Sequence, residues 1–277
     1  NIEKEEQASI EVARLMADFH NEIAKTGYSK KDLEIFLIRI LFCLFADDTG
    51  IFEKNLFKDY IEDRTNIDGS DLGIHLLAIF DVLSTKREDR QTNIDEQLNK
   101  FPYINGGIFK DPIKPISLDA QAKLKLSICC KADWSQISAS IFGSLFQGVM
   151  DEKNRRNLGT HYTSEKNIIK VVQPLFLDEL YIEFDKVKYD KKKLDEFHKK
   201  LTTLTFFDPA CGCGNFLVVA YRELRRLEGK ILEWKNKTGQ LMLLGVEDIS
   251  IININQFYGI EIEEFPSLVA KTAMYLV

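Results

Sequence analysis

The sequence predicts an α/β protein whose N-terminal part, over residues 1–150, is entirely helical. In that part apolar residues recur at helical spacing, and Leu33 to Ala46 is apolar on nearly every side, as in a helix buried within a bundle. In residues 151–277 short apolar runs instead alternate with amphipathic stretches. This order predicts a parallel, doubly wound sheet, so we expect two domains, 1–150 and 151–277.

The other elements of residues 1–150 follow from capping and chain-breaking residues. Asp47 and the residues after it are expected to end the buried helix, and Asp133 is a good N-cap for a helix over 134–149. The segment 101–115 is rich in glycine and proline, which predicts a structured loop. Further helices are expected around residues 10–19 and over residues 70–84, 91–100 and 118–130.

Residues 151–277 predict the order helix, helix, strand, helix, strand, helix. Ser164 is expected to cap the first helix, which runs to about Phe184, with Glu165 in its first turn, where the helix dipole favours an acid. Residues 239–255 form an insertion that is partly strand-like. The remaining elements are expected to be a polar helix over 190–202, a short buried strand over 204–207, a helix over 215–229, a strand over 256–260 and a helix from Pro266.

Composition and charge restrict the class of protein. The 277 residues can hold about two domains. No apolar run approaches the ~18–20 residues of a membrane span, and we expect a cytoplasmic location. The net charge of −6 is not typical of a nucleic-acid-binding protein, which usually has a basic face. The lysines between 186 and 200 are interleaved with acids, which favours a solvated helix face over a phosphate track. Because the sequence starts at Asn1 and ends inside an apolar helical pattern, we expect a larger parent polypeptide.

The segment from Asp208 to Asn215 (DPACGCGN) carries the main functional signal. An apolar run leads directly to an acid, a proline and two glycines at the start of a helix, where glycine lets the backbone approach a ligand closely. Asp208 ends the strand and can accept charge-assisted hydrogen bonds from an ammonium group. The spacing is not G-x-G-x-x-G and no G-K-[ST] follows, so we expect a nucleotide-like ligand without a pyrophosphate.

A second acid, Glu261, follows the next predicted strand. Ligands of open α/β sheets lie beyond the carboxyl ends of the strands, where an acid can accept two hydrogen bonds from ribose hydroxyls. Glu261 is farther from the glycines than the ~20 residues of the simplest such unit, and the insertion accounts for the excess. Glu263 is the alternative acid. Asn215 is expected either to contact the ligand or only to cap the helix over 215–229.

The five cysteines do not suggest a disulfide framework in a chain of this length. Cys211 and Cys213 form a C-x-C pair without a second His or Cys pair nearby, which is weak evidence for a metal or redox site. We therefore expect no metal ion.

DPACGCGNF resembles the cofactor loop DPAxGSGxF of S-adenosylmethionine-dependent DNA amino-methyltransferases. GTHYTS (159–164) resembles the motif that closes over the methionine end of the cofactor in the gamma class, and FYGIE (257–261) resembles the second strand with its ribose-binding acid. More narrowly, several phrases resemble MmeI-type single-chain restriction–modification enzymes (type IIG/IIL) from about residue 10 to the end. These phrases are FADDTGIF (45–52), FPYINGGIF (101–109), DWSQISASIFGSLFQGVMD (133–151), RRNLGTHYTS (155–164) and YGIEIEEFP (258–266).

The resemblance implies a helical spacer followed by the N-terminal portion of an incomplete Rossmann-like methyltransferase domain. It implies S-adenosylmethionine as cofactor, double-stranded DNA as the partner of the parent protein, and N6-methylation of adenine. Asp208 would lie near the methionine amino group, and Cys213 stands where the family commonly has serine. The cofactor-binding residues that it implies are Thr160, His161, Tyr162, Thr163, Asp208, Pro209, Ala210, Cys211, Gly212, Gly214, Asn215 and Glu261.

Two parts of such an enzyme are missing from the sequence. The family's catalytic [N/D]-P-P-[Y/F] loop needs adjacent prolines, and none of the six prolines is adjacent to another, so we expect no catalytic residue and no activity in this chain alone. Residues 1–150 contain no convincing P-D…E-x-K nuclease cluster. A non-catalytic, methyltransferase-like module of a phage-defence complex remains an alternative, as does methylation of RNA or protein.

Overall fold

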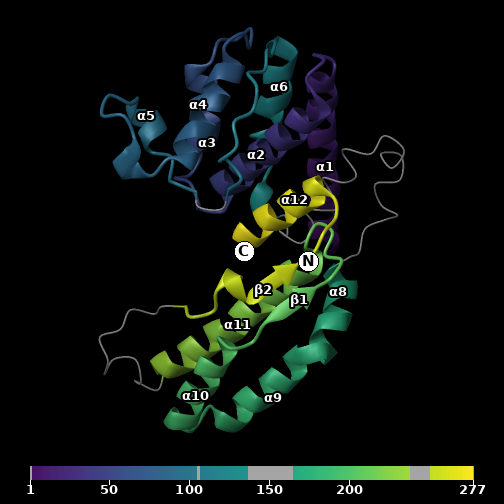
Figure 1. The fold of residues 1–277 in the computed structure, drawn as a ribbon, viewed down its shortest axis with the longest axis vertical. Helices are drawn as coiled ribbons and strands as arrows, with labels where there is room; N and C mark the ends of the chain where they lie inside the picture. Colours follow the sequence, from purple (N-terminus) through teal and green to yellow (C-terminus); the bar gives the residue numbers. More distant parts are fainter. Residues whose placement is uncertain (1, 105–106, 137–164, 238–249, 277) are drawn as a thin grey trace. The chain divides into compact units, whose positions relative to one another are not determined.

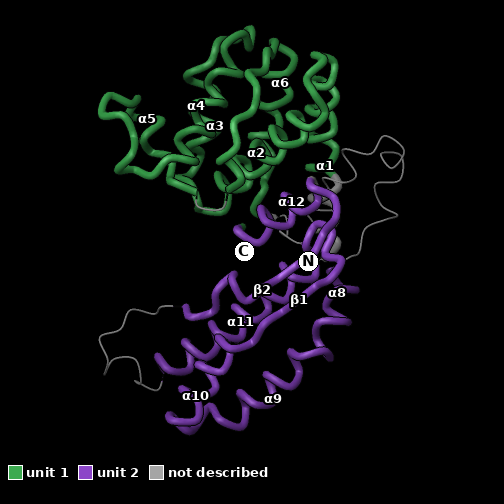
Figure 2. Tube along the Cα trace, in the orientation of Figure 1, with its two compact units in different colours: residues 1–162, 276 green, residues 163–275, 277 purple. Residues whose placement is uncertain are grey.

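The computed structural model describes residues 2–104, 107–136, 165–237 and 250–276 (Figure 1). Apart from its last two residues, the chain divides into two compact units, Asn1–Tyr162 and Thr163–Tyr275 (Figure 2). The domain boundary predicted near residue 150 falls outside the described residues and stays a prediction. None of the described helices is both long and apolar enough to cross a bilayer.

The described part of the first unit is helical, as predicted. Its core helix α2 is buried over almost all of its length from Leu33 onward, which confirms the prediction made from its all-round apolar pattern. Ser29 caps this helix by accepting a hydrogen bond from the backbone N–H of Asp32 at 3.2 Å. The helices are α1 (Ile2–Ala24), α2 (Lys30–Asp48), α3 (Leu56–Arg64), α4 (Leu72–Ser84), α5 (Glu96–Asn99) and α6 (Ala120–Cys129), with 3₁₀ turns at Arg87–Asp89 and Trp134–Gln136.

Arg39 of α2 holds the predicted structured loop in place. This arginine is 2% exposed, and it donates hydrogen bonds to the carbonyl oxygens of Ile108, at 2.9 Å, and Asp111. Its guanidinium also lies 5.5 Å from the ring centre of Phe80 and 5.7 Å from that of Phe109. A buried charge is tolerated here because backbone carbonyls and aromatic faces replace its hydration.

Two predicted helices of this unit differ from the structure. The helix expected over 91–100 is a single turn, α5, because Asp95 caps it late by accepting from the N–H groups of Gln97 and Leu98. The helix expected over 134–149 begins as a 3₁₀ turn at Trp134, and its remainder lies outside the described residues.

The second unit contains a small parallel sheet among helices. Strands β1 (Phe206–Asp208) and β2 (Phe257–Gly259) pair in parallel, with Asp208 opposite Gly259. The helices are α8 (Glu165–Val172), a π-helical segment (Gln173–Leu177), α9 (Asp178–Val187), α10 (Lys191–Leu201), α11 (Asn215–Lys237) and α12 (Glu264–Tyr275), with a 3₁₀ turn at Ile254–Gln256.

The first predicted helix of this unit is interrupted at Pro174. Proline has no backbone N–H and cannot complete the α-helical ladder, and a π-helical turn occupies Gln173–Leu177. The helix predicted over 215–229 instead continues to Lys237, since Gly229 is exposed and a single glycine weakens a helix without ending it. Ser164 lies outside the described residues.

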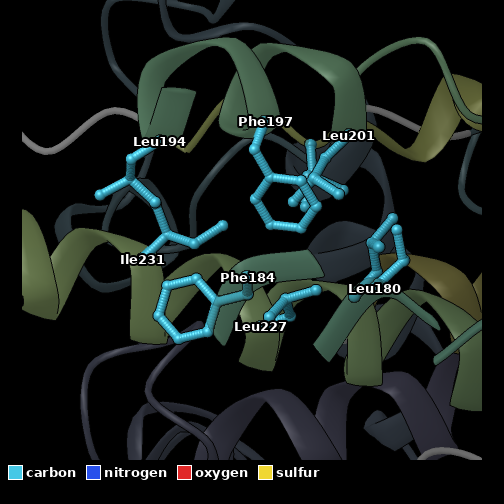
Figure 3. Packing of buried hydrophobic residues seen from close by; sticks show 9 residues of the cluster. Leu180, Phe184, Leu194, Phe197, Leu201, Leu227 and Ile231 are labelled. Atoms are coloured by element: carbon cyan, nitrogen blue, oxygen red, sulfur yellow. The ribbon is translucent and has the colours of Figure 1, made fainter. Parts of the chain in front are cut away.

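The core of this unit lies between α9, α10 and α11. Figure 3 shows apolar side chains from the three helices meeting, among them Phe184, Phe197 and Leu227. A second cluster packs α8 onto α11 through Ile168 and Val219, which are fully buried. The rings of Phe206 and Phe257 stack at 4.8 Å and connect the strands to these helices.

The prediction that the strand near 204–207 is buried was wrong for one of its faces. Phe207 is 62% exposed and its strand partner Tyr258 is 54% exposed, whereas Phe206 and Phe257 pack against the helical core. Among the described residues, helix α11 contacts both strands. Alternate residues of a strand point to opposite faces, so the Phe207 face of this two-stranded sheet lies open.

Candidate functional site

The segment from Asp208 to Asn215 forms a strand-to-helix corner, as the sequence predicts. Strand β1 ends at Asp208 and helix α11 begins at Asn215. The backbone N–H of Ile260 donates to the carbonyl oxygen of Asp208 at 3.0 Å, and the N–H of Cys211 donates to the carbonyl oxygen of Ile260 at 2.9 Å. The turn is thereby fixed to the residue that follows β2, and the ends of both strands form one edge.

The two glycines of the corner have left-handed backbone conformations. Gly212 has φ +52° and Gly214 has φ +80°. A Cβ atom added to Gly214 would lie 2.8 Å from the Cβ of Ala270 in α12, whereas one added to Gly212 would meet none of the described residues within 4 Å. Gly214 is therefore required by both conformation and space, while Gly212 leaves its backbone uncovered on the open side of the turn.

The carboxylates of Asp208 and Glu261 lie at the ends of the two strands. Asp208 Oδ1 accepts a hydrogen bond from the N–H of Ala210 at 3.1 Å, and Glu261 Oε1 accepts one from the N–H of Glu263 at 2.9 Å. Glu261 is partly covered, whereas Glu263 is exposed. Each carboxylate retains acceptor capacity after its backbone contact.

Burial and nearby negative charges raise the pKa values of the two thiols in the corner. Burial raises the pKa of Cys211, and the nearby charges of Asp208 and Glu261 raise it further. Burial raises the pKa of Cys213 to about 12, with Glu261 and Cys211 adding to the effect. These thiols are protonated at neutral pH and are poor nucleophiles and metal ligands. Among the described residues, no three His, Cys, Asp or Glu side chains are grouped to hold a metal ion.

The remaining corner residues lie where the sequence predicts them. Pro209 and Ala210 are exposed in the turn, and Asn215 opens helix α11. The other four predicted contacts, Thr160, His161, Tyr162 and Thr163, lie outside the described residues.

Sequence reasoning missed a contact between the two helices next to the corner. Arg222 of α11 donates two hydrogen bonds to the carboxylate of Glu165 in α8, with Nη1–Oε2 at 2.9 Å and Nη2–Oε1 at 2.6 Å. This bidentate geometry is the strong form of the arginine–carboxylate pair. The two residues are 57 positions apart, and no spacing in the sequence signals their pairing.

A groove of about 560 Å³ runs along β1 and reaches the corner at Asp208 and Pro209. Its lining is mostly apolar and comes from α8, the π-helical segment, α9, β1 with the two residues before it, and the start of α11, together with Lys200 of α10. Val171, Leu175 and Phe207, which are more than half exposed, contribute to it.

Several basic residues of this unit are paired with acids. Lys188 pairs with Asp185 at 2.7 Å and Lys200 pairs with Glu183 at 2.6 Å. Arg226 of α11 pairs with Glu223 at 2.6 Å. This pairing agrees with the interpretation of a solvated helix face.

Two protein-family models match this chain, one in its N-terminal part and one in its C-terminal part. A family model described as the MmeI helicase spacer domain matches residues 31–109, and one described as the MmeI DNA-methyltransferase domain matches residues 184–277. The chain belongs to the MmeI-type restriction–modification family. The glycine corner and Glu261 both fall within the match to the MmeI methyltransferase domain.

Two relatives of the MmeI-type chain illustrate the similarity. DNA methyltransferase A of Bacillus subtilis (strain 168) is 39% identical over 279 residues, which cover 99% of this chain and 31% of the relative. The solved structure of the type IIL restriction–modification enzyme MmeI in complex with DNA is 54% identical, with a TM-score of 0.86, over 96% of this chain and 36% of that chain. The chain thus spans about a third of the length of these relatives.

Proposed function

We propose that this chain comprises the helical spacer, over residues 1–150, and the cofactor-binding part, over residues 151–277, of a DNA adenine N6-methyltransferase that uses S-adenosylmethionine. The observation that carries the proposal is the glycine corner, with Asp208 and Glu261 on neighbouring strand ends. The corner lies within the match to the MmeI methyltransferase domain. This arrangement fits a nucleoside with a cationic tail better than a nucleoside triphosphate.

The chemistry of the corner fits S-adenosylmethionine. The open space beside Gly212 lets a ligand approach the backbone, and the residual acceptor capacity of Asp208 suits the ammonium group of the methionine end. Glu261 would accept hydrogen bonds from the ribose hydroxyls. When bound, the cofactor supplies an electrophilic methyl group on a sulfonium sulfur.

The other predicted contacts complete the proposed site. The backbone of Pro209, Ala210 and Cys211 would form its floor, with Asn215 at the N-terminus of α11. The four residues from Thr160 to Thr163 would bind the cofactor carboxylate through hydroxyl and backbone N–H groups at a helix start.

We further infer that the two-stranded sheet belongs to a larger, Rossmann-like sheet in the parent polypeptide. The exposed Phe207 and Tyr258 and the apolar groove along β1 support this inference, because an uncovered apolar sheet face is costly in water. Further strands beside β1 would fill the groove.

The proposed substrate is an adenine in double-stranded DNA. The base would be swung out of the duplex so that its exocyclic nitrogen can reach the methyl group. The residues that orient this nitrogen belong to the [N/D]-P-P-[Y/F] loop, which is not among the 277 residues. The chain alone would therefore transfer no methyl group, and its location would be the cytoplasm.

Calorimetric titration of the full-length protein with S-adenosylmethionine tests the proposal. Loss of a hydrogen bond to a charged group costs about 1.5–3 kcal/mol, so Asp208→Ala and Glu261→Ala should each weaken binding roughly 10- to 150-fold. Glu263→Ala is the matched control and should bind like the wild type. Absence of binding by the wild type, or equal binding by all four proteins, would refute the proposed site.

A further inference from the structure

Gly259 lies at the last position of β2, directly opposite Asp208, and the side chain of Cys211 covers it. A Cβ atom added to Gly259 would lie 2.7 Å from Cys211 Sγ, 3.1 Å from Cys211 Cβ and 3.2 Å from Leu217 Cδ1. Contacts below about 3 Å are much shorter than the 3.5–4.0 Å separation of atoms in favourable contact. The Cys211 side chain thus fills the space that a side chain at position 259 would need.

Space, and not backbone conformation, is the reason for a glycine at position 259. Gly212 and Gly214 have positive φ angles, but Gly259 is not among the described glycines that do. Alanine could therefore adopt the backbone conformation of residue 259 without strain. Any effect of Gly259→Ala should come from its contacts with Cys211 and Leu217.

The covered glycine also bears on the position of Glu261. The N–H of Cys211 donates to the carbonyl oxygen of Ile260, and the carbonyl oxygen of Cys211 accepts from the N–H of Gly214 at 2.8 Å. A side chain at 259 would push Cys211 away from the end of β2 and lengthen the bond to Ile260. Gly259 thus determines how closely the glycine turn approaches the end of β2, two residues before Glu261.

We propose that Cys211 and Gly259 form a positioning pair that sets the separation between the glycine turn and Glu261 in the cofactor site. This inference rests on the proposed function. The pair does not depend on a hydrogen bond between the Cys211 side chain and the ligand. The pair works because one side chain is absent and the other is small.

A double-mutant cycle in the full-length protein tests the pair. The variants are Gly259→Ala, Cys211→Ala and the two together. Gly229→Ala is the control, because a Cβ at this glycine of α11 meets no atom of the described chain within 4 Å. Affinity for S-adenosylmethionine is measured by calorimetry, and the stability of each ligand-free protein by urea unfolding.

If the cost of this overpacking falls on the position of the glycine turn, Gly259→Ala should lose affinity about tenfold or more. In the Cys211→Ala background the same substitution should cost about threefold or less, because Sγ is gone and only the 3.1 Å contact with Cβ remains on that side. Gly229→Ala should bind like the wild type. If Gly259→Ala fails to fold, recovery of folding and binding in the double variant supports the pair equally.

Three outcomes would overturn the inference: no loss in Gly259→Ala, an equal loss in both backgrounds, or failure of both the single and the double variant to fold. A wild-type protein that does not bind S-adenosylmethionine refutes the proposed function and, with it, the positioning role. In that case the unfolding measurements still show whether Cys211 and Gly259 are coupled, so the two failures are distinguishable.

Discussion

Glu228→Ala is expected to cause the largest loss of stability among single substitutions in α11. Glu228 is 1% exposed and, besides the bond from Arg225, accepts hydrogen bonds from four groups. These are the Ser250 hydroxyl at 2.5 Å, the N–H of Ile251 at 2.8 Å, the N–H of Ile252 at 3.2 Å and Nε2 of His198 at 3.1 Å. Glu228 thereby holds the segment that leads into β2 against the helix that leads out of the glycine corner.

The magnitude follows from the donors that alanine would leave without an acceptor. Arg225 also contacts the carboxylate, at 3.3 Å, and Lys235 contacts Nδ1 of His198 at 3.1 Å, so the imidazole presents its Nε2 hydrogen to Glu228. Removing one member of a buried charged network costs about 3–5 kcal/mol. We expect Glu228→Ala to lower the free energy of unfolding of this unit by about 4 kcal/mol at pH 7.

The pH dependence gives a second measure of the same network. Burial raises the pKa of Glu228, but the hydrogen bonds from His198, Ser250, Ile251 and Ile252 outweigh burial and lower it from 4.5 to about 2. A carboxyl pKa that is lower in the folded state stabilises the protein above the unfolded value and loses this contribution as pH falls. A shift of this size corresponds to about 3 kcal/mol, lost between about pH 4.5 and pH 2.

Urea unfolding followed by circular dichroism, with hydrogen exchange at Ile251 and Ile252, measures these effects. The matched control is Glu233→Ala, because Glu233 lies on the same helix with its side chain 63% exposed and pairs with Lys237 at 2.6 Å. The difference in stability between the wild type and Glu228→Gln should shrink as pH falls from about 4.5 to 2. The reasoning is refuted if Glu228→Ala and Glu233→Ala differ by less than about 1 kcal/mol, or if exchange at the two amides is unchanged.

Two further substitutions test the remaining features. Gly214→Ala would place a side chain at a positive φ angle and within 2.8 Å of Ala270. It should lower the free energy of unfolding by about 2–4 kcal/mol in urea titrations. An unchanged unfolding midpoint would contradict this prediction. Burial raises the pKa of Asp47 to about 6, although the N–H groups of Phe57 and Lys58 oppose the rise, so the folded state binds its proton more tightly than the unfolded state. Stability should therefore fall by up to about 3 kcal/mol as pH rises from about 4 to 6, and Asp47→Asn should abolish this slope in urea titrations across that range.

The sequence predicted the local features well because they depend on neighbouring residues. The all-round apolar pattern from Leu33 to Ala46 requires a helix buried on every side, and α2 is such a helix. The order acid, proline, glycine, glycine after an apolar run predicted a strand-to-helix corner, and the structure has one between Asp208 and Asn215. The lengths of elements were predicted less well, because periodicity captures neither the capping hydrogen bonds of Asp95 nor the missing backbone N–H of Pro174.

What the sequence alone determined is the helical first part, the glycine corner and the family to which these patterns belong. Tertiary structure decided which distant groups meet there: Cys211 covers Gly259, Arg222 pairs with Glu165, and Glu228 binds the chain before β2. These contacts join residues tens of positions apart, and they depend on how helices and strands pack rather than on the preference of any segment. For the same reason, only the fold shows that Gly259 is a glycine for lack of space, while Gly214 is one for its conformation as well.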